Sequence, residues 1–290
     1  MSVETAIVAV HGIGNQQGGM LPDEAATVLA ERWSGKLAAG YRDAGLTGAP
    51  PRIVAAYYAH LVDDMAQGST SDVDRLTPAE KEWAWAWLRE LGVPEPVAQG
   101  PLTRPLRQGL DWLARRRGTG AEVLGRIMVA LLREVYVYMT RPAVRERCQA
   151  VVVEALRTSG ARVVAAHSLG SVVAYEALCA NPDLDVDLLV TLGSPLGLPG
   201  AVFDGLMPEP SGGRAHRPAG VRRWVNLADP GDLVAVPARL GDKFPVDQHA
   251  EAYIGAGDFH TFGGYLASGL TAAALAPYTD PLPPPVASGA

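Results

Sequence analysis

Short, unbroken runs of apolar residues alternate along the chain with longer stretches that have helical periodicity. The apolar runs cover residues 5–10, 52–60, 161–167, 188–192 and 222–227. The helical stretches cover residues 22–39, 141–158, 169–180 and 262–275. An apolar run without polar alternation is typical of a strand that is buried on both faces. Strands that alternate with helices predict an α/β fold, in which helices flank a mostly parallel central sheet.

The pattern changes between residues 61 and 140, where only helical stretches are found. The sequence Thr77-Pro78-Ala79-Glu80 is a capping box with proline at the first helical position, so a helix is predicted to begin there. Further helices are predicted over residues 105–116 and 121–139. This segment therefore has the pattern of a helical insertion into the sheet domain.

These boundaries divide the chain into three parts. We expect residues 1–60 and 141–276 to form the sheet domain, and residues 61–140 to form the helical insertion, placed as a lid or a side subdomain. Residues 277–290 are rich in proline and small side chains. They are predicted to be a flexible tail.

Charge is distributed unevenly between these parts. Residues 100–147 hold ten arginines and four acidic residues, a local charge of +6, whereas the whole chain carries −6. The negative total argues against nucleic acid as a partner, because such proteins neutralise phosphates with an excess of cations. Trp83, Trp87 and Leu91 recur at helical spacing, which favours packing of the insertion onto the domain. Contact of these tryptophans and arginines with a membrane surface is the alternative.

The sequence contains few features that indicate a cofactor or a cellular compartment. Cys148 and Cys179 both lie in helical stretches, which predicts free thiols, and no spacing of Cys and His suits a metal. No cofactor is therefore expected. The most apolar helical stretch, residues 127–139, is interrupted by Arg133 and Glu134 and is too short to span a bilayer. The N-terminal residues lack the features of a signal peptide, so a cytoplasmic protein is the default expectation.

The most informative motif follows the apolar run at residues 161–167. Ser168 stands in the sequence Ala166-His167-Ser168-Leu169-Gly170, between a predicted buried strand and a predicted helix. A nucleophilic serine needs a tight strand-to-helix turn with small residues two positions before and after it. Ala166 and Gly170 meet this requirement. The alternative interpretation is a serine that caps an ordinary helix.

A glycine-rich loop follows the first predicted strand, in the sequence H-G-I-G-N-Q that begins at His11. Gly12 and Gly14 have the spacing of a dinucleotide-binding loop, but the third glycine would fall at Gln17 and is missing. Acyl transfer instead needs two backbone N–H donors about 3 Å from the developing oxyanion. The amide of Ile13 in this loop is the candidate for one of them. A purely structural glycine turn remains the alternative.

The second donor is expected from Leu169, directly after the serine. Together, H-G-I-G-N-Q and A-H-S-L-G-S resemble the lipase- and esterase-like branch of the α/β-hydrolase superfamily, including proteins similar to the GPI inositol-deacylases. The resemblance covers residues 5–275 except for the helical insertion. One departure is Ala166, where the family usually has glycine. The resemblance implies a catalytic triad in the chain order serine, acid, histidine.

The chain offers candidates for the acid and the base in that order. Asp232, followed by Leu-Val, is the favoured acid, and Asp229 in an Asp-Pro-Gly turn is the alternative. His260, just before the last helical stretch, is the favoured base, and His249 is its main rival. His167 adjoins the serine, but it is predicted to point to the opposite side of the strand.

The function these residues imply is that of a serine hydrolase. It would cleave a carboxylic ester of a small-molecule or lipid-like acyl substrate through Ser168, Asp232, His260 and an acyl-enzyme. The same residues would also serve a thioesterase, an amidase or an acyltransferase. The hypothesis from a different class is a catalytically inactive α/β-hydrolase fold that acts as a binding module.

Overall fold

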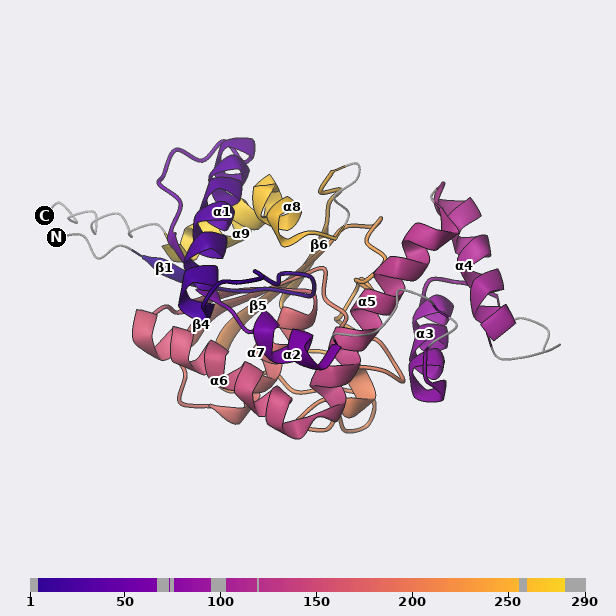
Figure 1. Ribbon diagram of the computed structural model, residues 1–290. Coiled ribbons are helices and arrows are strands. Elements are labelled where there is room, and N and C mark those ends of the chain that lie inside the picture. Colours follow the sequence, from indigo (N-terminus) through magenta and orange to yellow (C-terminus); the bar gives the residue numbers. More distant parts are fainter. Residues whose placement is uncertain are drawn as a thin grey trace, which may run out of the picture.

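The protein has an α/β fold built on one parallel sheet (Figure 1). The computed structural model describes residues 5–66, 73, 76–94, 103–118, 120–255 and 260–279. Within these residues the sheet has six strands in the order β2-β1-β3-β4-β5-β6. The strands are β1 (Ala6–Val10), β2 (Arg52–Ala56), β3 (Val163–His167), β4 (Val186–Leu192), β5 (Val221–Ala228) and β6 (Gln248–Glu251). Every pairing is parallel, so the predicted α/β class is confirmed, with a sheet that is wholly parallel.

Helices cover both faces of the sheet, as the sequence pattern predicts (Figure 1). One face carries α1 (Pro22–Asp43), α8 (Phe262–Ala267) and α9 (Gly269–Thr279). The other face carries α6 (Pro142–Ser159) and α7 (Leu169–Ala180). The strands β1 and β3 are buried at every residue because both faces are covered.

The insertion consists of α2 (Ala59–Ala66), α3 (Pro78–Glu90), α4 (Thr103–Arg117) and α5 (Ala121–Thr140). In Figure 1, α3, α4 and the start of α5 lie at the right of the molecule, beyond the carboxyl ends of the strands. The apolar core of these helices is continuous with the core between the sheet, α6 and α7. The insertion therefore shares the hydrophobic core of the sheet domain.

The capping box of α3 forms as predicted. The Thr77 hydroxyl accepts a hydrogen bond from the Glu80 amide at 3.3 Å, and the Glu80 carboxylate accepts one from the Thr77 amide at 2.7 Å. Trp83, Trp87 and Leu91 all pack against the shared core, which agrees with the packing interpretation of their spacing. No helix among the described residues combines the length and the apolar character needed to cross a membrane.

The second predicted strand was too long. It was expected to reach residue 60, but β2 ends at Ala56 and α2 begins at Ala59. Tyr57 and Tyr58, which lie between these two elements, make contacts with other parts of the fold. Tyr58 donates its amide to Nε2 of His11 at 3.1 Å and its hydroxyl to the His11 carbonyl at 2.5 Å. These bonds turn the chain out of the sheet, which apolar patterning does not reveal.

The predicted closing helix over residues 262–275 is broken into α8 and α9 at Ser268. The amide of Gly269, at the start of α9, donates to the Asp43 carboxylate at 2.7 Å. A Cβ at Gly40 would lie 2.4 Å from the Leu266 carbonyl oxygen, so α1 lies directly against the break. The break is thus set by close packing against α1.

The predicted tail also begins too early. Residues 277–279 belong to α9, and the buried Thr279 hydroxyl lies 3.0 Å from the hydroxyl of Tyr41 in α1. The rest of the predicted tail lies outside the described residues. The strand β6 was not among the predicted strands, because three of its four residues, Gln-His-Ala-Glu, are polar and none of the four is fully buried.

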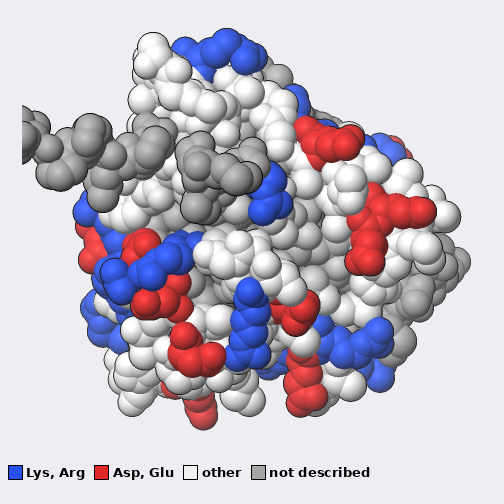
Figure 2. Space-filling view, turned by 90° about the vertical axis from the view of Figure 1, so that its left-hand side faces the viewer, with Lys and Arg blue, Asp and Glu red and all other residues white. Residues whose placement is uncertain are grey.

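The amino ends of the strands carry paired surface charges. Arg162 and Arg222 each form ion pairs with both Asp185 and Asp187, at distances between 2.7 and 3.3 Å. Figure 2 faces this end of the molecule and shows basic and acidic side chains interspersed. Exposed pairs of this kind contribute little stability individually.

A buried ionic cluster connects the insertion to the sheet domain. Glu176 of α7, whose side chain is inaccessible, accepts hydrogen bonds from Tyr138 Oη at 2.6 Å and Arg145 Nε at 2.7 Å. It also accepts bonds from Gln149 Nε2 at 3.1 Å and from the Met207 amide at 2.9 Å. Burial, together with this carboxylate, raises the pKa of Tyr138 well above its ordinary value, so its hydroxyl remains a donor. One side chain thus links α5, α6 and α7.

We expect Glu176→Leu to destabilise the fold strongly. It would leave the largely buried Arg145 guanidinium without its carboxylate, and breaking such a pair costs about 3 kcal/mol or more. Urea denaturation followed by circular dichroism measures the change in the free energy of unfolding. The control is Asp183→Ala, which breaks the exposed pair with Arg157 and should cost less than about 1 kcal/mol. Equal losses in the two variants would contradict the assigned role of Glu176.

Candidate active site

The candidate site lies at the carboxyl ends of β1 and β3, where the direction of chain winding changes. From β1 the chain crosses by α1 to β2, over one face of the sheet, and from β3 it crosses by α7 to β4, over the other face. The helices that follow these two neighbouring parallel strands therefore lie on opposite faces of the sheet. In open parallel sheets, ligands bind in the crevice at such a point.

Ser168 occupies a strained turn between β3 and α7. Its φ is 53° and its ψ is −129°, and among the described residues it alone combines a side chain beyond glycine with a positive φ. Such a conformation costs about 1–3 kcal/mol and persists only where the surroundings impose it. Here the Ser168 amide donates to the Leu192 carbonyl at 3.0 Å, and its carbonyl accepts from the Ser171 hydroxyl at 2.6 Å. An ordinary helix cap does not need this conformation.

Two glycines let the loop after β1 lie directly against this turn. A Cβ at Gly12 would lie 2.5 Å from the Cβ of Ser168. A Cβ at Gly170 would lie 2.3 Å from the His11 carbonyl oxygen. Both distances are far below van der Waals contact, so each position requires glycine. The predicted glycine-rich loop and the predicted turn are thus brought together.

Ser168, His260 and Asp232 form a chain of hydrogen bonds. His260 Nε2 lies 2.8 Å from Ser168 Oγ, and His260 Nδ1 lies 2.8 Å from Asp232 Oδ2. The Asp232 side chain is inaccessible, and that of His260 is 9% exposed. These are the three residues that the sequence prediction named as acid, base and nucleophile. Residues 257–259, which precede the histidine in its motif, lie outside the described residues.

The hydrogen bonds fix the tautomer of His260. An ionised carboxylate only accepts hydrogen bonds, so Nδ1 of His260 carries the proton toward Asp232. In the neutral ring Nε2 is then an acceptor, and the Ser168 hydroxyl donates to it. The serine proton is therefore directed to the ring nitrogen that could take it during a reaction.

Asp232 is held by further donors that the sequence did not reveal. Its Oδ1 accepts from the amides of Val234 and Ala235 at 2.8 and 3.3 Å. Its Oδ2 also accepts from the Tyr265 hydroxyl at 2.7 Å. Burial, with Asp232 nearby, raises the pKa of Tyr265 well above its ordinary value, so this hydroxyl stays protonated and donates. Gly193 permits the approach, since a Cβ there would lie 2.6 Å from Asp232 Oδ2.

Asp229 and His249, the alternative acid and base, form hydrogen bonds with other groups. Asp229 accepts hydrogen bonds from the amides of Gly231 at 2.6 Å and Ile254 at 2.8 Å, which makes it a loop-stabilising residue. His249 lies on β6, with its ring nitrogens 2.9 Å from Asn226 Nδ2 and from Glu251 Oε1. Neither residue bonds to Ser168 or to His260.

His11 is a structural part of the loop after β1. Its Nε2 accepts the Tyr58 amide, so its Nδ1 carries a proton and donates to the Gly12 carbonyl at 2.7 Å. The ring also stacks on Tyr58, with centroids 4.2 Å apart. Burial lowers the pKa of His11 from 6.5 to about 4, so the ring is neutral near pH 7. Its role is therefore to orient the loop.

Two backbone amides of the loop after β1 and the turn after β3, those of Ile13 and Leu169, have no hydrogen-bond partner among the described residues. The Gly12 carbonyl accepts from His11 Nδ1 and, at 3.1 Å, from Asn15 Nδ2. In a trans peptide the N–H points opposite to the carbonyl, so the Ile13 amide faces away from these two donors. Within the described part of the chain, the Ile13 amide and the Leu169 amide donate to no protein group. The helix dipole of α7 adds positive potential at Leu169.

His167 lies closer to the site than predicted. It makes no hydrogen bond to Ser168, but its ring centroid is 4.6 Å from that of His260, and it stacks on Phe262 at 5.5 Å. It is fully buried, and neither of its ring nitrogens has a hydrogen-bond partner. Burial therefore lowers the pKa of His167 well below its ordinary value. A neutral His167 packs against the ring of His260.

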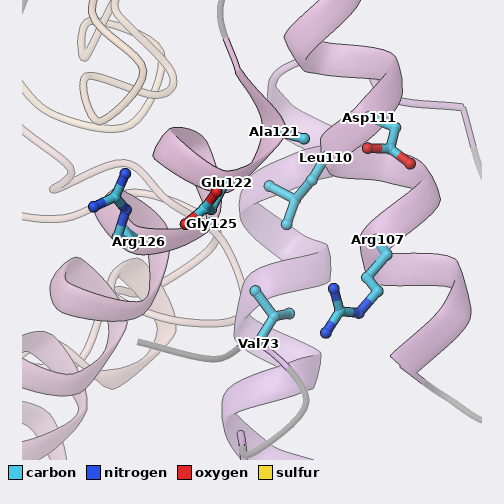
Figure 3. A pocket seen from close by; sticks show the side chains of 8 residues that line it. All are labelled: Val73, Arg107, Leu110, Asp111, Ala121, Glu122, Gly125 and Arg126. Atoms are coloured by element: carbon cyan, nitrogen blue, oxygen red, sulfur yellow. The ribbon is translucent and has the colours of Figure 1, made fainter. Parts of the chain in front are cut away.

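Outside the Ser168 site, the described residues include two cysteines and a hollow between two helices. Among the described residues, no cluster of three His, Cys, Asp or Glu side chains could hold a metal, and both cysteines are free thiols. A hollow of about 500 Å³ lies between α4 and α5 (Figure 3). It is lined by Arg107 and Asp111 of α4 and by Glu122 and Arg126 of α5, and none of the site residues borders it. Comparison of the chain with family models, with curated proteins and with solved structures gives no match.

Acidification is expected to destabilise the site through His11. Because its pKa is lowered in the folded state, the unfolded chain binds the proton more readily between pH 6.5 and about 4. The free energy of unfolding should fall as the pH drops through this window, with a His11 contribution of about 2 kcal/mol between pH 7.5 and 5. Urea denaturation at the two pH values measures it.

The matched variant is His11→Gln, which has no titratable group at this position. Its loss of stability between pH 7.5 and 5 should be smaller than that of the wild type by about 2 kcal/mol. The buried His167 is retained in both proteins, and burial is the largest cause of its lowered pKa, so most of its contribution cancels in the comparison. Identical losses in the two proteins would show that His11 does not titrate in this range.

Proposed function

We propose that the protein is a serine hydrolase that cleaves a carboxylic ester through Ser168. The observation that carries the proposal is the hydrogen-bonded series Ser168–His260–Asp232, which begins at a strained strand-to-helix turn. A strained non-glycine backbone at a buried serine is typical of a nucleophile held clear of its sheet. The free amides of Ile13 and Leu169 beside it are the second requirement of acyl transfer.

The architecture supports an α/β-hydrolase type of fold for this enzyme. The serine follows β3, the acid follows β5, and the histidine precedes α8, in the chain order serine, acid, histidine. The loop after β1 supplies one oxyanion donor, and the residue after the serine supplies the other. On this assignment residues 59–140 are an insertion that covers the carboxyl edge of the sheet.

In the first half of the reaction, Ser168 Oγ attacks the carbonyl carbon of the ester. His260 Nε2 takes the hydroxyl proton as the new C–O bond forms. Asp232 stabilises the resulting imidazolium and keeps its Nδ1 proton in place. The negative charge on the former carbonyl oxygen is met by the two amides. Collapse of this intermediate breaks the bond to the alcohol, which leaves with the proton from His260.

In the second half, water hydrolyses the acyl-enzyme. His260 Nε2 removes a proton from the water while its oxygen attacks the acyl carbon, and the same two amides stabilise the second oxyanion. The bond to Ser168 Oγ then breaks, and His260 returns the proton to it. The products are a carboxylic acid and the free enzyme, with no change of oxidation state.

A fluorophosphonate probe is expected to label the wild-type protein once, at Ser168. The serine should attack phosphorus as it would attack an acyl carbon, and displace fluoride. Intact-mass spectrometry reads the added phosphonyl group. Ser168→Ala should remain unlabelled, whereas the exposed control Ser211→Ala should be labelled like the wild type. A folded wild type that neither reacts with the probe nor hydrolyses p-nitrophenyl esters would favour a non-catalytic binding module.

Substitution of Asp232 and of Asp229 should have very different effects on kcat. Asp232→Asn would place an amide donor opposite His260 Nδ1, which favours the wrong tautomer, and should lower kcat by roughly 10⁴-fold. Asp229→Asn changes a carboxylate that bonds only to backbone amides, and should lower kcat by less than about tenfold. Steady-state hydrolysis of p-nitrophenyl butyrate measures both. A larger loss in Asp229→Asn would reverse the assignment of the acid.

A further inference from the structure

Helix α5 of the insertion reaches the loop that follows β1. Glu134 on this helix is buried, and its Oε1 accepts a hydrogen bond from the Gly14 amide at 3.0 Å. The same oxygen accepts a second bond from Gln16 Nε2, also at 3.0 Å. A carboxylate 120 residues away along the chain therefore holds the loop that carries the Ile13 amide.

The peptide group between Ile13 and Gly14 is held at both ends. The Ile13 carbonyl accepts from Asn15 Nδ2 at 3.0 Å, and the Gly14 amide of the same peptide group donates to Glu134. Because the carbonyl and the N–H of a trans peptide point in opposite directions, the two contacts fix the plane of this peptide. The Gly14 amide is thereby engaged, whereas the neighbouring Ile13 amide donates to no protein group of the described residues.

A second contact joins the insertion to the other side of the site. Trp87 Nε1 of α3 donates to the Leu233 carbonyl at 2.6 Å, and both residues are buried. Leu233 directly follows Asp232. Movement of the insertion as a free lid would break this bond. It would also separate the buried carboxylate of Glu134 from its hydrogen-bond donors, which offset the cost of its desolvation.

We infer that Glu134 is a positioning residue for the oxyanion site, and that the helical insertion is a fixed support of the reaction centre. Through the Gly14 amide, Glu134 sets the direction of the Ile13 N–H without touching the substrate. This inference rests on the proposed function. It assigns the insertion a part in stabilising the transition state.

The test compares Glu134→Leu with Glu134→Gln. The two donors of the loop, the Gly14 amide and Gln16 Nε2, bind the same oxygen, so the single carbonyl oxygen of glutamine can accept both of these bonds, whereas leucine can accept neither. For p-nitrophenyl butyrate, we expect Glu134→Leu to lower kcat by about tenfold or more with KM changed by less than about threefold, because the oxyanion contact is made in the transition state. Glu134→Gln should stay within about threefold of the wild-type kcat.

The matched control is Glu80→Ala, which removes another buried carboxylate from the insertion. Glu80 accepts from the Thr77 amide at the start of α3 and, among the described residues, makes no hydrogen bond to the loop after β1. Its kcat per folded molecule should equal that of the wild type. Should Glu134→Leu fail to fold, Glu134→Asp keeps the charge but retracts the oxygens by about one bond length, and a lower kcat at unchanged KM is again expected.

Two results would overturn the inference: wild-type kcat in Glu134→Leu, or a loss in Glu134→Gln as large as that in Glu134→Leu. If the wild type itself hydrolyses no ester and reacts with no fluorophosphonate, the proposed function fails separately. The positioning contact is then judged by hydrogen exchange of the Gly14 amide. Faster exchange in Glu134→Leu than in Glu80→Ala supports the contact, and equal exchange refutes it.

Discussion

Gly12 and Gly170 allow the loop after β1 to lie against the turn after β3, and every other feature of the site depends on this contact. It follows from the pairing of β1 with β3 as parallel neighbours, which brings their carboxyl ends together. The strain of about 1–3 kcal/mol at Ser168 is offset by the buried core of two fully covered strands. A side chain at either glycine would separate the two backbones, and with them the serine and the Ile13 amide.

Much of the fold and of the site could be predicted because their signals are local. Buried strands give unbroken apolar runs, the capping box at Thr77 marks a helix start, and the residues flanking Ser168 mark a tight turn. The choice of Asp232 and His260 needed the resemblance to a family, since a lone aspartate or histidine has no distinguishing pattern. The structure joins these two residues by a hydrogen bond, whereas Asp229 and His249 bond to other groups.

The features that could not be predicted depend on contacts between distant segments. Tyr265 and Gly193 meet at Asp232 from separate elements, and neither stands in a motif. The break before Gly269 is set by α1, and the end of β2 is set by bonds from Tyr58 to the first loop. Periodicity within one segment carries no information about such partners, so helix breaks and strand ends were the least accurate predictions.

The helical insertion was predicted from its pattern, but its relation to the site follows from packing. An insertion with a separate core could move as a unit, whereas this one shares its core with α6, α7 and the sheet. The buried hydrogen bonds of Glu134, Trp87 and Glu176 connect the insertion to the loop after β1, to Leu233 beside Asp232, and to α7. A displacement of the insertion would therefore disturb the groups around Ser168 together. In such an arrangement the geometry of the candidate site and the stability of the insertion depend on each other, because the same side chains determine both.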